Sequence, residues 1–316
     1  MNSSTSRNPF VVGQWVRGEK FFGREEIISE LLHGHRQTIW VAGLRRMGKT
    51  SLLREIERRV LQNSHSPYLP LYWDLEGSTD DQTLRESLLA ALDETAGRLA
   101  VDTDWEALST PEIIRKIQKA ARQQEKTLFL LCDEVEALLT VAKDNPHLLG
   151  RLRRVMQASD GMRCILTATR RLARLETLDL AGSKTDLAVE TSPFLHGFTP
   201  PLYLSPLSET EAQPLLQQAQ FTIETQKMLL QLSGGHPFLL QILAKRALEN
   251  GAVDPAFESM QHDETLQNFF IVDYNSLQAE EKSFLRRCAE NKVPASATGA
   301  SENMAKQTLL ALGMLY

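Results

Sequence analysis

Residues 43–51 constrain the fold of this chain more than any other stretch of its sequence. They read Gly-Leu-Arg-Arg-Met-Gly-Lys-Thr-Ser and match the phosphate-binding pattern G-x-x-x-x-G-K-[ST] at every fixed position. The apolar, β-branched run 38–42 precedes this loop and predicts a buried strand, and the apolar positions after the loop recur at helical spacing. Strand, glycine loop and helix are the context that such a loop requires, so we expect it to bind a nucleoside triphosphate.

The residue types of this loop suit a phosphate group. Gly43 and Gly48 permit backbone angles that turn successive amide N–H groups toward phosphate oxygens. We expect the Lys49 ammonium to bind the β- and γ-phosphates and to act in catalysis, and the Thr50 hydroxyl to ligate Mg²⁺. The remaining residues predicted to bind the nucleotide here are Leu44, Arg45, Arg46, Met47 and Ser51. The alternative, a glycine turn with an exposed lysine, is disfavoured by the flanking strand and helix.

The length and composition are typical of an ordinary globular protein. The 316 residues suggest two or three units, and the net charge of −5 gives no overall attraction to nucleic acid. No run of about 18 apolar residues predicts a membrane span. The three cysteines, Cys132, Cys164 and Cys288, lack metal-ligand spacing and favour buried thiols in a reducing compartment, so we expect a cytoplasmic protein.

The pattern of apolar runs predicts the fold class. Five short runs alternate with helical patterns, and they cover residues 38–42, 69–75, 128–132, 163–169 and 201–204. This alternation predicts an α/β fold in which a parallel five-stranded sheet carries helices on both faces. After about residue 205 only helical patterns follow, with a capping box at 208–211, a helix over about 223–232, and a third helix after His236-Pro237.

A second motif lies at the end of the third apolar run. Residues 127–132 lead directly into Asp133 and Glu134. We expect Asp133 to bind Mg²⁺ through water and Glu134 to polarise the attacking water. Two acidic residues after a strand can also be a helix cap, but the phosphate loop upstream favours the site. The next apolar run ends at Thr169 and is followed by Arg170. Either residue could contact the γ-phosphate, Arg170 as a catalytic residue, with a solvated helix start at Arg170 as the alternative.

With these residues in place, the chain resembles the STAND class of AAA-related ATPases, and in particular the prokaryotic subfamily grouped with archaeal-type ATPases. Residues 8–10 and 21–25, Asn-Pro-Phe and Phe-Phe-Gly-Arg-Glu, are similar to the N-terminal signature of that family, whose aromatic segment packs on the adenine. The resemblance therefore implies that Phe22 and Gly23 bind nucleotide. Residues 235–237, Gly-His-Pro, are similar to its lid motif, in which Pro237 would touch the base. Asp133-Glu134 and Thr169-Arg170 match its second motif and its first sensor.

The resemblance also implies a domain plan within an AAA+/ASCE-type P-loop NTPase. It comprises an N-terminal tail and adenine-side segment over 1–19, the NTPase core over 20–205, a helical lid over 206–255 and a partial winged-helix-like domain over 256–316. The apolar end at 314–316 suggests that the full-length protein continues. No arginine finger is assigned, because several arginines are candidates: Arg151, Arg153, Arg154, Arg171 and Arg174.

The function implied by the resemblance is a molecular switch that binds ATP or ADP with Mg²⁺ and hydrolyses ATP slowly. Its implied partners are a nucleotide-dependent homo-oligomer and an effector or sensor domain, either C-terminal to this chain or in trans. A DNA-acting ATPase of the origin-recognition or transposition type is the main rival, with modest support from Arg286, Arg287 and Lys292. A scaffold that binds nucleotide without hydrolysis also remains open, and a small-molecule kinase is disfavoured. The sequence has no guanine-reading N/T-K-x-D motif, which favours ATP.

Overall fold

The computed structural model describes residues 8–95, 97–99, 104–105, 107–157, 161–169, 194, 198, 200–275 and 277–289. Contacts divide the chain into two compact units. The described residues of Glu25–Ala42 and Lys49–Tyr203 form one, here called the sheet unit. Those of Met1–Arg24, Gly43–Gly48 and Leu204–Tyr316 form the other, here called the helical unit. No helix in the described part of the chain has the length and apolar character to cross a membrane.

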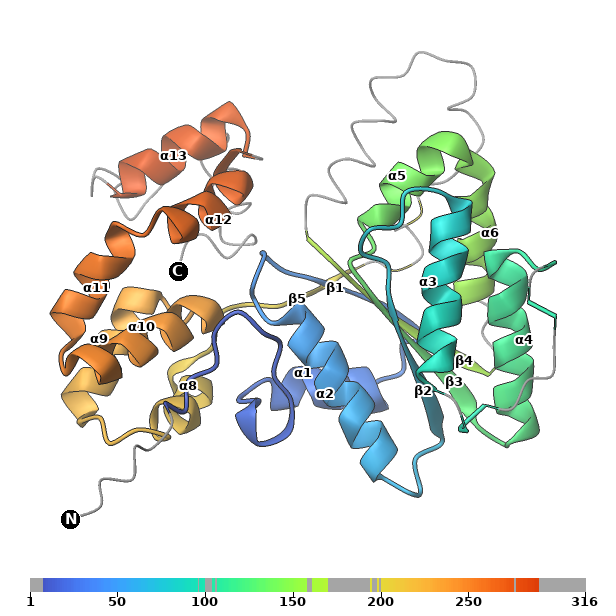
Figure 1. Ribbon diagram of the computed structural model, residues 1–316, viewed down its shortest axis with the longest axis horizontal. Coiled ribbons are helices and arrows are strands. Elements are labelled where there is room, and N and C mark those ends of the chain that lie inside the picture. The colour runs from blue at the N-terminus through green and yellow to red at the C-terminus, as the bar shows by residue number, and fades with distance from the viewer. Residues whose placement is uncertain are drawn as a thin grey trace. The chain divides into compact units, whose positions relative to one another are not determined.

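The sheet unit is built on a parallel sheet of five strands within its described residues (Figure 1). The strands are β1 (Thr38–Ala42), β2 (Tyr68–Asp74), β3 (Thr127–Asp133), β4 (Met162–Ala168) and β5 (Leu202–Tyr203). Their spatial order is β2-β3-β4-β1-β5, and every neighbouring pair is parallel. This confirms the predicted α/β P-loop fold, and no strand end differs from the predicted one by more than one residue.

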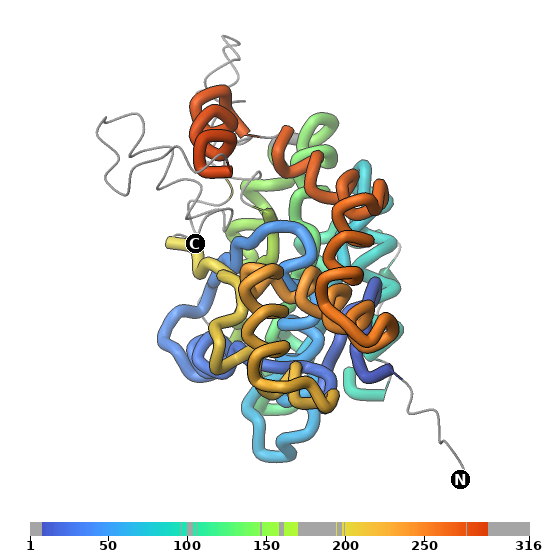
Figure 2. The backbone as a smooth tube through the Cα atoms, turned by 90° about the vertical axis from the view of Figure 1, so that its left-hand side faces the viewer, coloured from blue at the N-terminus to red at the C-terminus, as the bar shows by residue number. Residues whose placement is uncertain are grey.

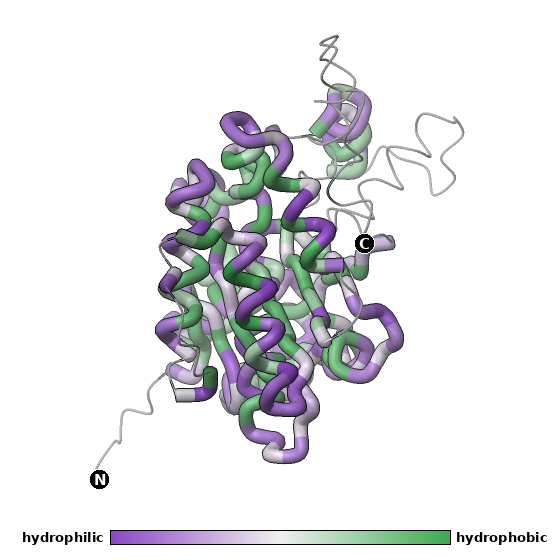
Figure 3. Tube along the Cα trace, turned by 90° about the vertical axis from the view of Figure 1, so that its right-hand side faces the viewer, coloured by the Kyte–Doolittle hydropathy of each residue, from purple (hydrophilic) through white to green (hydrophobic). Residues whose placement is uncertain are grey.

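Side chains alternate between the two faces of this sheet. Leu130 and Cys132 of β3 belong to a core cluster that also contains Trp73 of β2 and Leu166 of β4. The helices that contribute to this cluster are α3 (Asp81–Asp93), α4 (Thr110–Gln123), α5 (Ala137–Asp144) and α6 (Pro146–Met156). Because side chains have a period of two along a strand, Asp133 points to the opposite face. In Figure 3 apolar and hydrophilic stretches alternate along the helices, as expected for helices with one buried side.

Two helices of the sheet unit bury apolar side chains without joining that cluster. They are α1 (Glu25–His33) and α2 (Lys49–Gln62), with Ile28, Leu31, Leu52, Leu53 and Ile56 almost completely buried. Helix α2 contacts β2, β3 and β4. The Arg163 side chain of β4 is buried too, and its guanidinium donates to the carbonyl oxygens of Leu31 and Gly34, each at 2.8 Å. These bonds satisfy a buried charge at the end of α1.

The helical unit contains six α-helices within its described residues. They are α8 (Glu209–Leu216), α9 (Ile223–Ser233), α10 (Pro237–Asn250), α11 (Val253–Gln261), α12 (Glu264–Asn275) and α13 (Ala279–Ala289). Figure 2 shows α8 to α11, coloured yellow to orange, and α9, α10 and α11 contact one another in pairs. Ser208 begins α8 with the predicted capping box, and Gly234 ends α9 at a φ of +57°. Residues 290–316 of the predicted winged-helix-like domain lie outside the described residues.

The N-terminal segment packs into this helical unit. Phe10 is buried in the core that α8, α9 and α10 form, and its ring stacks on Phe221 at 5.9 Å between ring centres. The main-chain N–H of Val11 donates to the Gln241 side chain at 3.1 Å, and the Asn8 side chain donates to the carbonyl of Lys245 at 3.3 Å. The described residues 8–12 are thus anchored to α10.

Candidate nucleotide site

The loop 43–48 joins β1 to α2 and belongs to the helical unit. Gly48 has a φ of +93°, which an L-residue with a side chain rarely adopts, although a Cβ there would meet nothing within 4 Å. At Gly43 the constraint is space, because a Cβ would lie 3.2 Å from the Cβ of Leu204. The Met47 side chain of the loop is buried. The two predicted glycines are therefore favoured for different physical reasons, conformation at Gly48 and close approach at Gly43.

Helix α2 begins at Lys49 and carries the second half of the phosphate motif. Lys49 is only 5 % exposed, and Ser51 is buried as well, whereas Thr50 is half-buried. The first amide N–H groups of a helix lack partners within it, and the helix dipole adds positive potential at this end. Lys49, Thr50 and Ser51 therefore lie where an anion is favoured.

The Asp133 carboxylate is held by three protein donors. The Tyr72 hydroxyl of β2 donates to Oδ2 at 2.9 Å, the Thr167 hydroxyl of β4 donates to Oδ1, and the main-chain N–H of Glu134 donates to Oδ1 at 3.1 Å. Asp133 is 1 % exposed. Burial, followed by the charge of Asp133, raises the pKa of Tyr72 far above its usual range, so the phenol remains a donor. Sequence patterns did not reveal Tyr72 or Thr167, because each lies inside an apolar run that reads as core.

Glu134 follows β3 in a left-handed backbone conformation, with a φ of +50°. Such a conformation is uncommon for a residue with a side chain and is often found at functional sites. Burial raises the pKa of Glu134 to about 7, and the charges of Glu136, Asp133 and Glu76 act in the same direction. The nearby Lys49 ammonium lowers it and does not outweigh burial. The carboxyl therefore titrates close to neutral pH, as suits a group that exchanges a proton.

Glu136 connects this turn to the end of β4. One of its carboxylate oxygens accepts a hydrogen bond from the main-chain N–H of Thr169, one of the two residues predicted to contact the γ-phosphate. The N–H of Val135 donates to the carbonyl of Thr167 at 3.2 Å, so two bonds join the same segments. Glu136 was not predicted, although a third acidic residue two positions after Glu134 was a signal for it. Arg170 lies outside the described residues.

The donor set here fits Mg²⁺ bound with a nucleotide. A carboxylate offers about four acceptor sites, and three protein donors leave Asp133 one of them. Mg²⁺ keeps several waters and typically takes one or two protein oxygens together with substrate phosphates. The Thr50 hydroxyl and the Asp133 carboxylate offer protein oxygens of this kind. Within the described ranges, no group of three or more His, Cys, Asp or Glu could hold a metal ion by itself.

In the helical unit, the two loop arginines contact helices of the C-terminal segment. The guanidinium carbon of Arg46 lies 3.6 Å from the ring centre of Phe269 in α12 and 4.4 Å from that of Phe238 in α10. Burial, followed by the charge of Arg45, lowers the pKa of Arg46. The Nε of Arg45 lies 3.8 Å from Oδ1 of Asp273 in α12. The phosphate loop is thus packed against α10 and α12 through its own variable positions.

The Gly-His-Pro segment lies at the start of α10. Pro237 occupies the first turn of that helix, and His236 is 6 % exposed. Neither ring nitrogen of His236 makes a hydrogen bond of good geometry with the residues that the structure describes, and its ring meets Phe270 edge-on at 5.6 Å. Burial lowers the pKa of His236 to about 4, against a weaker polar contact with the Arg45 main chain. Gly235 tolerates no side chain, because a Cβ would lie 2.3 Å from the carbonyl oxygen of Leu207.

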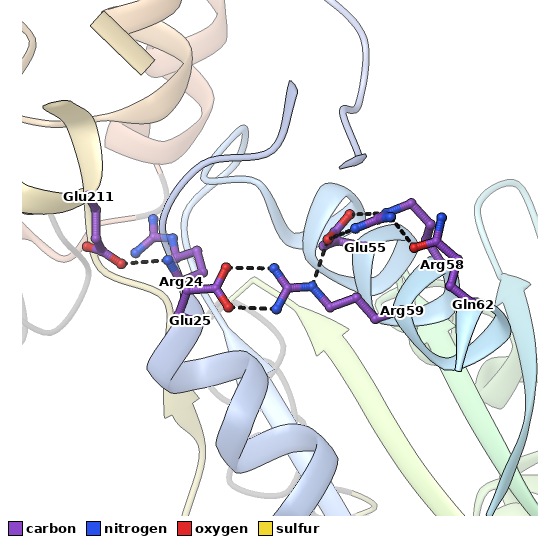
Figure 4. Close-up of polar contacts among 7 residues, drawn as sticks. All are labelled: Arg24, Glu25, Glu55, Arg58, Arg59, Gln62 and Glu211. Carbon is purple, nitrogen blue, oxygen red and sulfur yellow. Dashed lines mark hydrogen bonds and ion pairs between the residues drawn. The ribbon is translucent and has the colours of Figure 1, made fainter. Parts of the chain in front are cut away.

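The Phe-Phe-Gly-Arg-Glu segment packs on α8. Gly23 has a φ of +74°, and a Cβ there would lie 2.8 Å from the Cβ of Glu211. The main-chain N–H of Arg24 donates to Oε1 of Glu211 at 2.7 Å (Figure 4). Phe22 packs against the core of the helical unit. Figure 4 also shows the ion pair between Glu25 and Arg59, at 2.6 Å, within the sheet unit.

The predicted residues thus gather at two places. In the sheet unit, Lys49 is near Glu134, which follows Asp133 directly. In the helical unit, the loop arginines contact the segment around Pro237 and α12.

Comparisons with known proteins agree with this fold and these motifs. The family model described as the AAA domain matches residues 32–176. The Walker-type ATPase of Pyrococcus abyssi is similar in structure, with a TM-score of 0.66 at 15 % identity, over 96 % of this chain and 93 % of that chain. The ORC2 protein of Aeropyrum pernix, solved in ADPNP and ADP complexes, has a TM-score of 0.52 at 12 % identity, over 92 % and 85 % of the two chains. No curated protein matches the chain. Residues 32–176 therefore match the AAA domain model, and the chain has an AAA-like α/β P-loop fold.

Proposed function

We propose that this protein is an ATP-binding, slowly hydrolysing molecular switch of the STAND type, which couples nucleotide state to the helical lid and the helices after it. In this proposal residues 20–205 are the NTPase core, 206–255 the lid and 256–316 a winged-helix-like domain, preceded by the adenine-side segment 1–19. The observation that carries the proposal is the contact of Arg46, a residue of the phosphate loop, with Phe238 of α10 and Phe269 of α12.

The nucleotide chemistry rests on the residues already described. Lys49 and the first N–H groups of α2 would bind the β- and γ-phosphates, and Thr50 and Asp133 would hold Mg²⁺, which supplies charge neutralisation of the phosphates when bound. Glu134 would orient a water molecule and take its proton, and its raised pKa suits that role. The Glu136 carboxylate holds the main chain at Thr169, so one short segment would position both the proposed γ-phosphate contact and the proposed base.

The switch follows from competition for the loop arginines. A guanidinium that stacks on an aromatic ring is attracted by about 0.5–2 kcal/mol, and an approaching triphosphate attracts the same charge. ATP and ADP differ by one phosphate, so they would affect the contacts of Arg45 and Arg46 with α12 to different extents. Such differential contacts are what a ligand needs to shift a conformational equilibrium. A nucleotide-dependent homo-oligomer and an effector or sensor domain would respond to the resulting change in conformation.

Replacing Arg46 by alanine tests this coupling. We expect amide hydrogen exchange in α12, residues 264–275, to become about 3- to 30-fold faster, because the cation–π contacts of Arg46 are lost. In the wild type, exchange in α12 should differ between the ATP and ADP states, and in the Arg46→Ala variant this difference should shrink. Hydrogen exchange with mass spectrometry measures both effects.

Arg17→Ala is the matched control for this experiment. Its guanidinium carbon also lies over an aromatic ring, 5.3 Å from the ring centre of Trp15, and this ring belongs to neither α10 nor α12. It should leave α12 exchange unchanged. Identical α12 exchange with ATP and with ADP in the wild type would contradict the switch and leave a nucleotide-binding scaffold as the function.

A further inference from the structure

The residue that holds the Asp133 carboxylate from β2 is a tyrosine inside an otherwise apolar strand. Tyr72 is 5 % exposed, and its hydroxyl donates to Oδ2 of Asp133 at 2.9 Å. In the sheet, Tyr72 is in register with Leu131, so its side chain lies on the same face as Asp133, two residues further along β3. A phenylalanine would fill the same apolar space, and only the hydroxyl makes this bond.

The ring of Tyr72 is held in turn by α2. The guanidinium carbon of Arg54 lies 3.4 Å from the centre of that ring. Arg54 is four residues after Thr50, so the two lie on neighbouring turns of one side of the helix. The same guanidinium donates to Oε2 of Glu57 at 3.0 Å, which fixes it within α2. The Tyr72 side chain therefore spans from the helix that carries Thr50 to the strand end that carries Asp133.

The Asp133 carboxylate also accepts a hydrogen bond from β4, on its other oxygen. The Thr167 hydroxyl donates to Oδ1, while Tyr72 donates to Oδ2, so the two carboxylate oxygens have donors from the two neighbouring strands. Donors on both oxygens leave the carboxylate plane little freedom to rotate. Partners that orient a metal-binding carboxylate typically change metal affinity by about 10- to 100-fold when they are removed.

We infer that Tyr72 is a positioning residue of the magnesium site, where its hydroxyl and the Arg54 guanidinium against its ring fix the orientation of the Asp133 carboxylate. The inference rests on the proposed function, since it assigns a role within the same nucleotide site. It adds Tyr72, Arg54 and Thr167 to the residues on which Mg²⁺ binding depends. Tyr72 itself touches neither metal nor nucleotide in this role.

Tyr72→Phe isolates the hydroxyl, because it keeps the ring and its contact with Arg54. We expect the free Mg²⁺ concentration needed for half-maximal binding of a fluorescent ATP analogue to rise about 10-fold or more. Binding of the same analogue in EDTA should stay at the wild-type level, since Lys49 and the helix start are unchanged. Thr167→Val, which removes the other hydroxyl at nearly the same volume, should raise the Mg²⁺ requirement as well.

Tyr68→Phe is the matched control, because it removes a hydroxyl from the same strand. The Tyr68 hydroxyl donates to the carbonyl of Leu32 at 3.3 Å, so this variant should keep the wild-type Mg²⁺ requirement. In an Asp133→Asn background, Tyr72→Phe should add no further increase, because both changes act through one carboxylate.

Two results would overturn the inference. One is an unchanged Mg²⁺ requirement in Tyr72→Phe, with or without a lower melting temperature, which would give the hydroxyl only a structural role. The other is an equal increase in the Asp133→Asn background, which would show that Tyr72 acts elsewhere. Both presuppose that the wild type binds the analogue in a Mg²⁺-dependent way. A wild type that binds no nucleotide would instead overturn the proposed function.

Discussion

Replacing Glu134 by glutamine should lower the rate of ATP hydrolysis by about 10²- to 10⁴-fold while ATP binding stays close to the wild-type level. Glutamine has nearly the same size and can still orient a water molecule, but it cannot take a proton. The phosphate-binding residues Lys49 and Thr50 are untouched, so the affinity should not fall. Single-turnover phosphate release measures the first quantity, and isothermal titration calorimetry measures the second.

Glu76→Gln is a control for the loss of charge in this experiment. Glu76 is exposed, and its charge contributes to the raised pKa of Glu134, but it is not placed in the proposed chemistry. Its substitution should change the rate only slightly. If Glu134→Gln hydrolyses ATP at the wild-type rate, Glu134 is not the general base and the proposed role of this turn is wrong.

A second large effect concerns acid stability and arises from His236. Its pKa falls from 6.5 to about 4 on burial, so the unfolded chain binds a proton in this pH range that the folded chain does not. Protonation of His236 in the unfolded chain therefore lowers the free energy of unfolding as the pH falls from about 6.5 to about 4. Above pH 6.5, His236 does not change the free energy of unfolding with pH. The total is about 3 kcal/mol, and about 2 kcal/mol of it is already lost at pH 5.

Replacing His236 by leucine should remove this loss. We expect the variant to be at least as stable as the wild type at pH 7. The ring nitrogens of His236 make no hydrogen bond of good geometry within the described residues, so leucine breaks no such bond. At pH 5 the variant should then be more stable than the wild type by about 2 kcal/mol beyond any difference at pH 7. Urea unfolding curves at pH 7, 6 and 5 give these differences directly.

His262 provides the comparison for that series, because it is an exposed histidine of the same unit. His262→Leu should change the free energy of unfolding by a similar amount at each pH. Parallel pH dependence of the wild type and His236→Leu would contradict the assignment of the acid sensitivity to His236.

The fold could be predicted from the sequence because each strand of a parallel sheet is buried on both faces. A run such as 128–132 must then be apolar at every position, and five such runs are visible between helical patterns. The loop was equally visible, since Gly48 adopts a backbone conformation that other residues rarely adopt and Gly43 lies close to Leu204. The Ser208 capping box also appeared as predicted, because its bonds are local in sequence.

The supporting residues of the site were not visible, because they depend on register between distant strands. Tyr72 and Thr167 converge on Asp133 only after β2, β3 and β4 pair, over sequence separations of 61 and 34 residues. A tyrosine or a threonine in an apolar run is ordinary core composition, so nothing local marks them. The contacts of Arg46 with Phe238 and Phe269 were not visible for the same reason, since they join the loop to helices about 200 residues later in the sequence.

The membership of the loop 43–48 in the helical unit has a consequence for synthesis on the ribosome. Residues 43–48 leave the ribosome early, but the other main part of their unit begins only at Leu204. A nascent or truncated chain that ends before α10 would contain the complete G-x-x-x-x-G-K-[ST] pattern and lack the aromatic partners of Arg46. Expression of the first 203 residues alone is therefore a poor route to a native loop, and each newly made molecule completes this unit only after most of the chain has emerged.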